Sequence, residues 1–208
     1  MKKTRRRLLQ GLAVAPMRNG LGAGAAGLAL TTPVASPAAT PGCGADTGPT
    51  PRQTEGPYFS RQSPLRRSLL DSGLPGTRLV LAGLVRRLDC LPLAGALLDF
   101  WQADANGEYD NRGYRLRGHQ FTDAQGRYRL ETVLPGLYPG RTRHIHVKVQ
   151  APGGPVLTTQ LYFPDEAQNR TDGIFSSALL VELASPGQPA GPASVALQAV
   201  FDFVIAAA

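Results

Sequence analysis

The chain has 208 residues, with 22 lysines and arginines against 15 aspartates and glutamates, and a formal net charge of +7. This length suffices for one domain with a hydrophobic core and leaves a further segment in front of it. Six of the basic residues precede Asp46, the first acidic residue. The rest of the chain is therefore close to neutral, which argues against nucleic acid as a partner.

Residues 1–40 have the layout of an export signal. A basic start is followed by an apolar, glycine-rich run at 20–30 and then by small residues and prolines. Residues 4–9, Thr-Arg-Arg-Arg-Leu-Leu, resemble a twin-arginine signal and predict a periplasmic or extracellular protein. The alternatives are an ordinary secretory signal or a disordered basic arm. The apolar run is too short and too rich in glycine for a membrane span.

Cys43 and Cys90 are the two cysteines of the chain. In an exported protein, two cysteines most simply form one disulfide, which here would tie the amino-terminal arm to the first core strands. The alternative is lipid attachment at Cys43. The residues before it, Thr-Pro-Gly, lack the apolar residue that usually stands three positions ahead of a lipidated cysteine.

Residues 41–76 predict an extended arm, with a short helix near 67–71, and residues 77–208 predict one all-β sandwich domain. The second part alternates short apolar runs with glycine and proline, and it contains no long amphipathic helix. The expected strands lie at 78–88, 95–103, 126–133, 144–149, 156–163, 178–183 and 195–205. This spacing indicates a sandwich of about seven to eight strands, with long loops that form a metal site.

The strand at 144–149 carries two of the three histidines, His144 and His146. Because side chains alternate along a strand, both imidazoles lie on one face, while Ile145, Val147 and Val149 point into the core. Their backbones lie roughly 6 to 7 Å apart, a spacing that suits a shared metal ion. On this pattern alone the metal could be of almost any kind.

A long segment at 104–120 follows the second expected strand and is predicted to be a loop. It contains Tyr109, Tyr114 and His119. Loops of this length inside a compact domain often have a functional role. The alternative is that the two tyrosines cover an edge of the sandwich.

From residue 54 onward the chain resembles the intradiol ring-cleavage dioxygenases. The matching motifs are Glu55-Gly56-Pro57-Tyr58-Phe59, Asp99-Phe100-Trp101-Gln102-Ala103, Gly107-Glu108-Tyr109, Leu137-Tyr138-Pro139 with Arg141-Thr142-Arg143-His144-Ile145-His146, and Thr159-Gln160-Leu161-Tyr162-Phe163. Some members carry a long helical dimerisation segment before the Glu-Gly-Pro motif, whereas only about 50 residues precede it here. In this respect the chain is more similar to the protocatechuate 3,4-dioxygenase type, in its exported single-chain form.

The resemblance implies an Fe(III) enzyme whose metal ligands are Tyr109, Tyr138, His144 and His146. Such enzymes open a catechol ring between its two hydroxyls with O₂ and give a muconate-type diacid. The resemblance further implies that Tyr138 is the ligand that leaves the metal and acts as a base, while Tyr109 stays bound. Phenolate oxygen and imidazole nitrogen suit a hard ferric ion.

The resemblance also implies three residues beside the substrate. Arg141 would stabilise negative charge on the ring, since a guanidinium stays protonated at any working pH. Gln160 would form a hydrogen bond to a ligand or an oxygen species. Tyr58 would contact substrate at the pocket mouth. Both Gln160 and Tyr58 can instead be read as structural residues.

Several other candidates are assigned structural roles. These are Arg143, the core or edge aromatics Trp101, Tyr128 and Tyr162, and the third histidine, His119. In the segment after Tyr109, one of Arg112, Arg115 and Arg117 could pair with an aromatic carboxylate, or all three could lie on a solvated surface.

One position departs from the family pattern. Many members carry a bulky aromatic, usually tryptophan, where this chain has Gly140. The glycine predicts a more open wall beside Tyr138.

Two other kinds of protein remain as alternatives: a non-catalytic secreted binding module with a metal site, and a zinc or copper enzyme that uses the histidine pair. A structural zinc site favours cysteine and histidine, and neither alternative calls for the two tyrosines. We expect a catechol and O₂ as the small-molecule partners, and a homo-oligomer of at least two chains.

Overall fold

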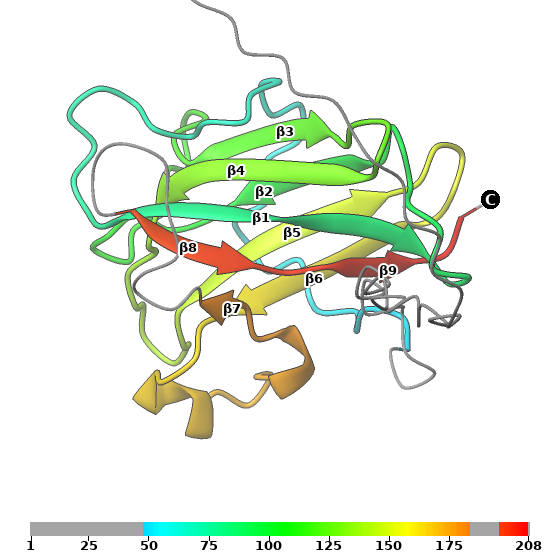
Figure 1. Ribbon diagram of the computed structural model, residues 1–208. Helices are drawn as coiled ribbons and strands as arrows, with labels where there is room; N and C mark the ends of the chain where they lie inside the picture. Colours follow the sequence, from blue (N-terminus) through cyan, green and yellow to red (C-terminus); the bar gives the residue numbers. More distant parts are fainter. Residues whose placement is uncertain (1–47, 184–195, 208) are drawn as a thin grey trace, which may run out of the picture. The chain divides into compact units, whose positions relative to one another are not determined.

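The computed structural model describes residues 48–183 and 196–207 (Figure 1). The expected export signal and Cys43 therefore lie outside the described residues, and the disulfide with Cys90 stays a prediction. The described residues form nine strands: β1 (Arg78–Arg87), β2 (Leu97–Trp101), β3 (Arg117–Phe121), β4 (Arg127–Val133), β5 (His144–Gln150), β6 (Val156–Tyr162), β7 (Glu182–Leu183), β8 (Leu197–Val200) and β9 (Phe203–Ile205). Two 3₁₀ turns, η1 (Ala167–Arg170) and η2 (Ser177–Leu179), lie between β6 and β7.

The strands build two sheets packed face to face, which confirms the predicted all-β sandwich (Figure 1). One sheet has the order β4-β1-β8-β7, with β9 also paired to β1, and the other has the order β3-β2-β5-β6. β1 pairs in parallel with β8 and β9, and the remaining pairs are antiparallel. β5 thus lies inside its sheet, held on both sides by β2 and β6.

The predicted loop at 104–120 was wrong at its end, because residues 117–121 form β3 and pair with β2. Alternation of apolar and polar residues does not predict β3, because the strand contains few apolar residues. It also buries a charged side chain, that of Arg117. Its guanidinium donates to the carbonyl oxygens of Asp110 and Tyr58. Hydrogen bonds of the buried guanidinium, rather than burial of apolar side chains, therefore hold this edge strand in place.

Two other expectations differ from the structure. The helix expected near residues 67–71 is absent, and Ser68 instead bridges Glu131 of β4. The run at 178–183 begins within η2, forms a single bridge from Leu180 to Tyr162 of β6, and becomes a strand only in the short β7. Both segments lie against the sheets and contribute buried leucines, Leu69 and Leu179, to the core.

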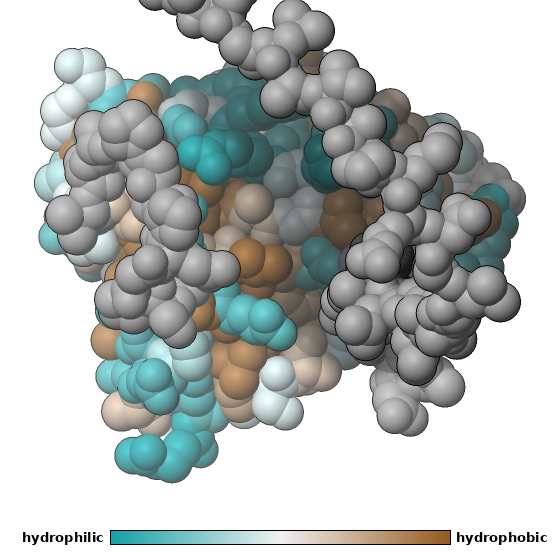
Figure 2. Space-filling view, in the orientation of Figure 1, coloured by the Kyte–Doolittle hydropathy of each residue, from teal (hydrophilic) through white to brown (hydrophobic). Residues whose placement is uncertain are grey.

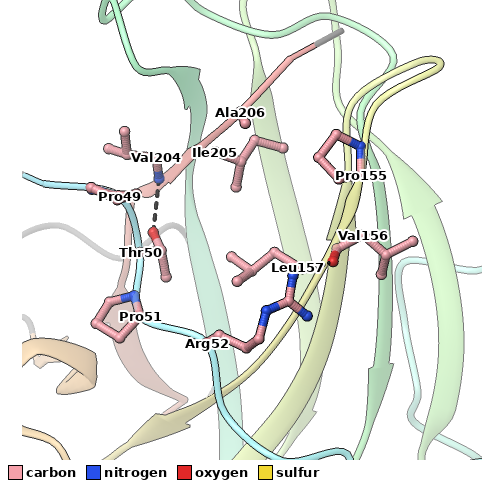
Figure 3. A pocket seen from close by; sticks show the side chains of 10 residues that line it. All are labelled: Pro49, Thr50, Pro51, Arg52, Pro155, Val156, Leu157, Val204, Ile205 and Ala206. Atoms are coloured by element: carbon pink, nitrogen blue, oxygen red, sulfur yellow. Dashed lines mark hydrogen bonds between the residues drawn. The ribbon is translucent and has the colours of Figure 1, made fainter.

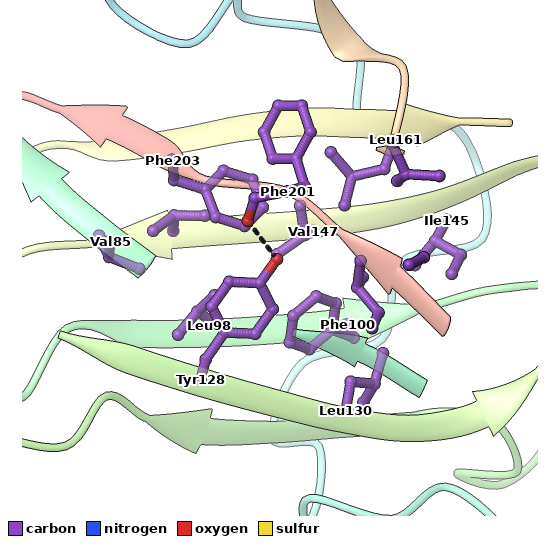
Figure 4. Packing of buried hydrophobic residues seen from close by; sticks show 14 of the residues in the cluster. Val85, Leu98, Phe100, Tyr128, Leu130, Ile145, Val147, Leu161, Phe201 and Phe203 are labelled. Carbon is purple, nitrogen blue, oxygen red and sulfur yellow. Dashed lines mark hydrogen bonds between the residues drawn. The ribbon is translucent and has the colours of Figure 1, made fainter. Parts of the chain in front are cut away.

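The core lies between the two sheets (Figure 4). Ile145 and Val147 of β5 reach it with Phe100 of β2, as the alternation along β5 predicts. Tyr128 also lies in this core, and its hydroxyl donates a 2.8 Å hydrogen bond to the carbonyl oxygen of Phe201. Burial raises the pKa of this phenol well above its ordinary value, so the hydroxyl stays protonated and donates.

The described part of the arm, residues 48–76, runs along both sheets. The Thr50 N–H donates to Val204 of β9 over 2.9 Å, and the Gln53 N–H donates to Thr158 of β6 over 2.8 Å. Between these contacts lies an apolar groove of about 330 Å³ lined by Pro51, Leu157 and their neighbours (Figure 3). Its lining does not include the candidate site residues, so this groove is separate from the candidate site.

The outer face of the five-stranded sheet carries exposed hydrophobic side chains among hydrophilic ones (Figure 2). Val200 of β8 and Leu183 of β7 are among them. Within residues 48–183 and 196–207, no helix has the length and apolar character that crossing a membrane requires.

Replacing Tyr128 with phenylalanine removes one buried donor and leaves the Phe201 carbonyl without its partner. We expect Tyr128→Phe to lower the free energy of unfolding by about 1 to 2 kcal/mol, measured by urea denaturation. Tyr114→Phe is the matched control, because the Tyr114 hydroxyl also donates to a backbone carbonyl, that of Arg61, but lies on the surface. The control is expected to change stability by about 0.5 kcal/mol or less. Equal effects of the two substitutions would contradict this account of the core.

Candidate active site

Strand β5 presents His144 and His146 on the face opposite the core. Both side chains are nevertheless buried, because the arm and two loops cover this face, and their Nε2 atoms approach to 3.2 Å. The predicted arrangement of two imidazoles on one face of a strand is thus present. Two ring nitrogens that face each other at this distance form the centre of the candidate site.

The two imidazoles are held by different means. His144 Nδ1 lies 2.6 Å from the carbonyl oxygen of Thr142. A carbonyl oxygen only accepts, so Nδ1 carries the proton and Nε2 offers a lone pair. His146 lies parallel to the indole of Trp101, with ring centroids 4.8 Å apart and an interplanar angle of 8°. Its Nδ1 is buried without a hydrogen-bond partner, so stacking fixes this ring.

Both histidines are neutral at physiological pH. Burial, opposed in part by the hydrogen bond to Thr142, lowers the pKa of His144 to about 4. Burial and the neighbouring His144 lower the pKa of His146 well below its ordinary value. Neutral imidazole is the form that binds a metal ion.

Tyr109 and Tyr138 bring two phenols to the same place. The Tyr109 hydroxyl lies 3.5 Å from His144 Nε2. The Tyr138 ring lies with its centroid 5.8 Å from that of His144 and 6.1 Å from that of Tyr109. Burial and then the proximity of Tyr138 raise the pKa of Tyr109 above its ordinary value, so its phenolate forms only when a cation is close.

Two glycines allow the tyrosine-bearing loops to meet. The Gly136 N–H donates to the Asp104 carbonyl over 2.7 Å. A Cβ added to Gly107, whose φ is +86°, would overlap the carbonyl oxygen of Leu137, and a Cβ on Gly136 would overlap the backbone of residue 107. Only residues without a side chain permit this approach.

Tyr138, Pro139, Gly140 and Arg141 form a tight turn. The Arg141 N–H donates to the Tyr138 carbonyl over 3.1 Å, and Gly140 has a φ of +80°. Proline second and glycine third, with positive φ at the glycine, is the pattern of a type II turn. A Cβ on Gly140 would meet nothing within 4 Å, so the space around this turn position is open.

Arg141 is fixed by a hydrogen-bonded network. Its Nε donates to Asp172 over 2.9 Å, and its Nη2 donates to the Gln160 side chain over 2.5 Å and lies 3.4 Å from the Tyr162 hydroxyl. Burial lowers the pKa of Arg141, but Asp172 more than offsets this, so the net shift is upward. Gln160 is held in turn by the Thr54 carbonyl.

Tyr58 lies against both phenols. Its ring stacks on Tyr109 with centroids 4.3 Å apart and an interplanar angle of 17°, and it meets Tyr138 edge-on at 6.2 Å. The backbone before it is also close, since a Cβ on Gly56 would stand 3.4 Å from His146 Cε1. The segment at 54–59 thus covers the imidazole pair from the arm side.

The structure brings together the predicted ligands and the three predicted substrate-side residues, while Arg115 and Arg117, after Tyr109, have other partners. Cys43 lies outside the described residues, so the predicted disulfide is not tested. Arg117 is buried against backbone carbonyls, and Arg115 pairs with Asp104 over 3.5 Å. Arg143 pairs with Glu166 over 2.6 Å, in line with its predicted structural role. His119 bonds to Ser63 outside the candidate donor set.

Sequence reasoning missed three contributors to the site. Asp172 orients Arg141, Trp101 stacks on His146, and Thr142 orients His144. A carboxylate 31 residues from its arginine leaves no local signal. The sequence predicts Trp101 as a core or edge aromatic. Aligning β2 with β5 places Trp101 directly opposite His146, so the pairing of these strands is the signal for the contact.

The donor set fits a ferric ion. Within the described residues, no group of three or more histidines, cysteines, aspartates or glutamates could hold a metal. A metal at His144 and His146 therefore depends on the phenols of Tyr109 and Tyr138. Phenolate oxygens suit a hard, highly charged ion better than they suit zinc, which favours cysteine and histidine in structural sites.

Comparison with known proteins decides the family. A family model described as Dioxygenase matches residues 54–207. A chlorocatechol 1,2-dioxygenase of Pseudomonas sp. (strain P51) is 31% identical over 179 residues, which cover 73% of this chain and 68% of the relative. The chain belongs to the intradiol dioxygenase family. This membership favours an enzyme over a non-catalytic sandwich.

Other relatives of this intradiol dioxygenase carry different substrate names. The β chain of a protocatechuate 3,4-dioxygenase from Burkholderia cepacia is 33% identical over 130 residues, 53% of this chain and 55% of the relative. The chain spans about two thirds of the first relative's length and about half of this one's. Among solved structures, the dioxygenase domain of a dioxygenase and carbohydrate-binding protein fusion from Streptomyces sp. SirexAA-E is 56% identical with a TM-score of 0.71, covering 77% of this chain and all of that one.

Asp110 closes the loop next to Tyr109 of this dioxygenase. Hydrogen bonds from the backbone N–H groups of Arg112, Arg115 and Gly113 hold the pKa of its carboxyl at about 2. A pKa below the unfolded value of about 4 stabilises the fold above pH 4, and this contribution is lost as pH falls towards 2.

We expect Asp110→Asn to lower the free energy of unfolding by about 1 kcal/mol at pH 7, with the difference from wild type shrinking as pH falls below about 4. Urea denaturation across this pH range measures it. Asp89→Asn is the control, since Asp89 pairs with Arg87 on the surface and such pairs contribute little. A difference for Asp110→Asn that is constant or grows in acid would refute the role of the carboxylate.

Proposed function

We propose that this protein is a non-haem Fe(III) enzyme that cleaves a catechol-type ring between its two hydroxyls with O₂ and releases a muconate-type diacid. The observation that carries the proposal is the convergence of two phenols and two neutral imidazoles in one buried site. Family membership supports the reaction class. The proposed ligands are Tyr109, Tyr138, His144 and His146.

A bound ferric ion would supply the positive charge that keeps the phenols deprotonated and makes a chelated catechol reactive towards O₂. The chain supplies the remaining groups. Tyr138 Oη takes a proton from a substrate hydroxyl as the tyrosine moves aside. Gly140 lies two residues after Tyr138 in the turn, and the space around it is open. We propose that the Tyr138 ring moves towards this space.

Arg141 stabilises the negative charge that builds on the substrate ring. Asp172 and Gln160 hold the guanidinium on both sides, so it needs no reorganisation when the charge develops. Gln160 reaches from β6, where it is paired in register with His146. Its amide nitrogen is already bonded to Thr54, so its role is to position Arg141.

Tyr58 completes the site from the arm. Stacked on Tyr109 and edge-on to Tyr138, it limits the space around both phenols and shields one face of the Tyr109 ring from water. We propose that the substrate ring contacts Tyr58 when it enters beside Tyr138. Water exclusion strengthens the electrostatic effect of Arg141, because charges act more strongly in a medium of low dielectric constant.

The ligand assignment is tested by colour and iron content. Tyrosinate bound to Fe(III) absorbs visible light, so the iron-loaded protein is expected to be coloured. Tyr109→Phe is expected to weaken or abolish the absorption, and His146→Ala to lose iron, with oxygen uptake on catechol falling at least about 100-fold in each. Tyr114→Phe, a few residues further along the same segment, is the control and keeps colour and iron.

Oxygen uptake should be followed over a panel of catechol, protocatechuate, hydroxyquinol and chlorocatechol, with the ring-opening position identified in each product. Colourless protein at full iron loading would refute the tyrosinate ligands. Cleavage outside the two hydroxyls would refute the intradiol reaction.

We also propose that the enzyme is exported by a twin-arginine-like signal and acts as a homo-oligomer. The support for export is the order of basic, apolar and small residues at 1–40. Replacing Arg5, Arg6 and Arg7 with lysine keeps the charge and is expected to leave the protein in the cytoplasm, measured by cell fractionation. Unchanged export of that variant would point to the general secretory route. Light scattering of the purified protein gives the oligomeric state.

A further inference from the structure

A cleft of about 440 Å³ opens beside Tyr138, on the side of its turn. It is lined by Leu137, Tyr138, Pro139, Gly140, Arg141, Gln168 and Thr171. Tyr138 and Arg141 therefore face both the buried donor set and this space. A substrate that enters between them has part of its surface in the cleft.

Gly140 keeps one wall of the cleft open. As the third residue of the type II turn it has a φ of +80°, and a side chain at this position would project into space with no neighbour within 4 Å. The opposite wall comes from η1 and the residue after it, through Gln168 and Thr171. A larger side chain at residue 140 would therefore have room to extend along this wall of the cleft.

The cleft offers no unpaired positive charge. Among its lining residues Arg141 is the one cation, and its guanidinium is paired with the buried carboxylate of Asp172. Leu137 and Pro139 are apolar, while Gln168 and Thr171 are polar and neutral. A carboxylate placed here would gain no ionic partner and would lose part of its hydration.

The size of the cleft exceeds that of a single ring. Pockets of about 300 to 1,000 Å³ enclose ligands of drug-like size, and this cleft adds to whatever space the chelated ring occupies beside the imidazoles. Neutral walls of mixed apolar and polar character match an aryl or aryl-alkyl group that carries hydroxyls or ethers.

We infer that the cleft bordered by Gly140, Gln168 and Thr171 is a subsite for a bulky, uncharged substituent on the catechol ring, so that the preferred substrates are catechols with a second ring rather than catechol or a catechol carboxylate. This inference rests on the proposed function and specifies its substrate class.

The first measurement compares kcat/KM of the iron-loaded enzyme for 4-phenylcatechol, catechol and protocatechuate, followed by oxygen uptake. We expect 4-phenylcatechol to exceed each of the other two by about tenfold or more. A value for 4-phenylcatechol equal to or below that for catechol overturns the subsite and leaves the proposed function intact. Absence of cleavage of every catechol at full iron loading overturns the proposed function, and the subsite with it.

The second measurement fills the cleft from the glycine side. Gly140→Phe is expected to lower the ratio of kcat/KM for 4-phenylcatechol to that for catechol about tenfold or more. Gly140→Asn is the matched control, since asparagine tolerates positive φ, also removes the glycine, and has a side chain much smaller than that of phenylalanine. The control is expected to keep the ratio within about threefold of wild type. Equal ratios in Gly140→Phe and wild type overturn the inference.

The third measurement fills the cleft from the opposite wall and avoids backbone strain at the turn. Thr171 has negative φ, and Thr171→Tyr is expected to lower the same ratio, with Thr171→Val as the control of nearly equal volume. Anaerobic calorimetric titration with 4-phenylcatechol gives a readout without turnover. There we expect the dissociation constant to rise about tenfold in Thr171→Tyr and to change little in Thr171→Val. A dissociation constant that Thr171→Tyr leaves unchanged overturns the subsite.

Discussion

The positions of both candidate phenolate donors depend on one backbone contact. The loop that carries Tyr109 and the loop that carries Tyr138 touch at Gly107 and Gly136, where neither residue has room for a Cβ. The hydrogen bond from Gly136 to Asp104 joins the loops at the same point. Since the imidazoles sit on a rigid inner strand, this contact decides whether two separate loops place their oxygens beside the same nitrogens.

The assembled site gathers several neutral nitrogen and oxygen donors in a small space. Two Nε2 atoms approach each other in a buried place, and burial raises the pKa of Tyr109 above its ordinary value. Polar atoms collected in this way cost free energy when they lack partners. Natural sequences accept such local conflicts where function requires them. The neutral imidazoles and the half-buried phenols are therefore available to the ferric ion that we propose, while Arg141 is paired with the Asp172 carboxylate.

Periodicity predicted what depends on local pattern. The alternation at residues 144–149 predicted the face of each imidazole, and the motifs supplied the candidate site residues, which the structure places close together. Periodicity failed to predict the strands whose positions depend on contacts between residues far apart in the sequence. β3 forms around a buried arginine, and the last predicted strand divides into β8 and β9 at residues 201–202. There Phe201 passes close over Gly83, and the Asp202 carboxylate accepts the Leu84 N–H that a strand would otherwise engage. The local sequence around Asp202 does not predict its contact with Leu84, because the two residues are 118 positions apart.

In the proposed enzyme, the turn at residues 138–141 links the reacting groups to the choice of substrate. Its first residue is a candidate ligand, its third opens the neighbouring cleft, and its fourth carries the fixed positive charge. The turn is held by its own hydrogen bond and by Asp172, which also accepts the Thr142 N–H just before the histidine strand. The backbone that orients Tyr138 and Arg141 therefore does not rely on packing by a side chain at residue 140. A change of side chain there can alter which ring substituents fit, while the donor set and the guanidinium keep their places.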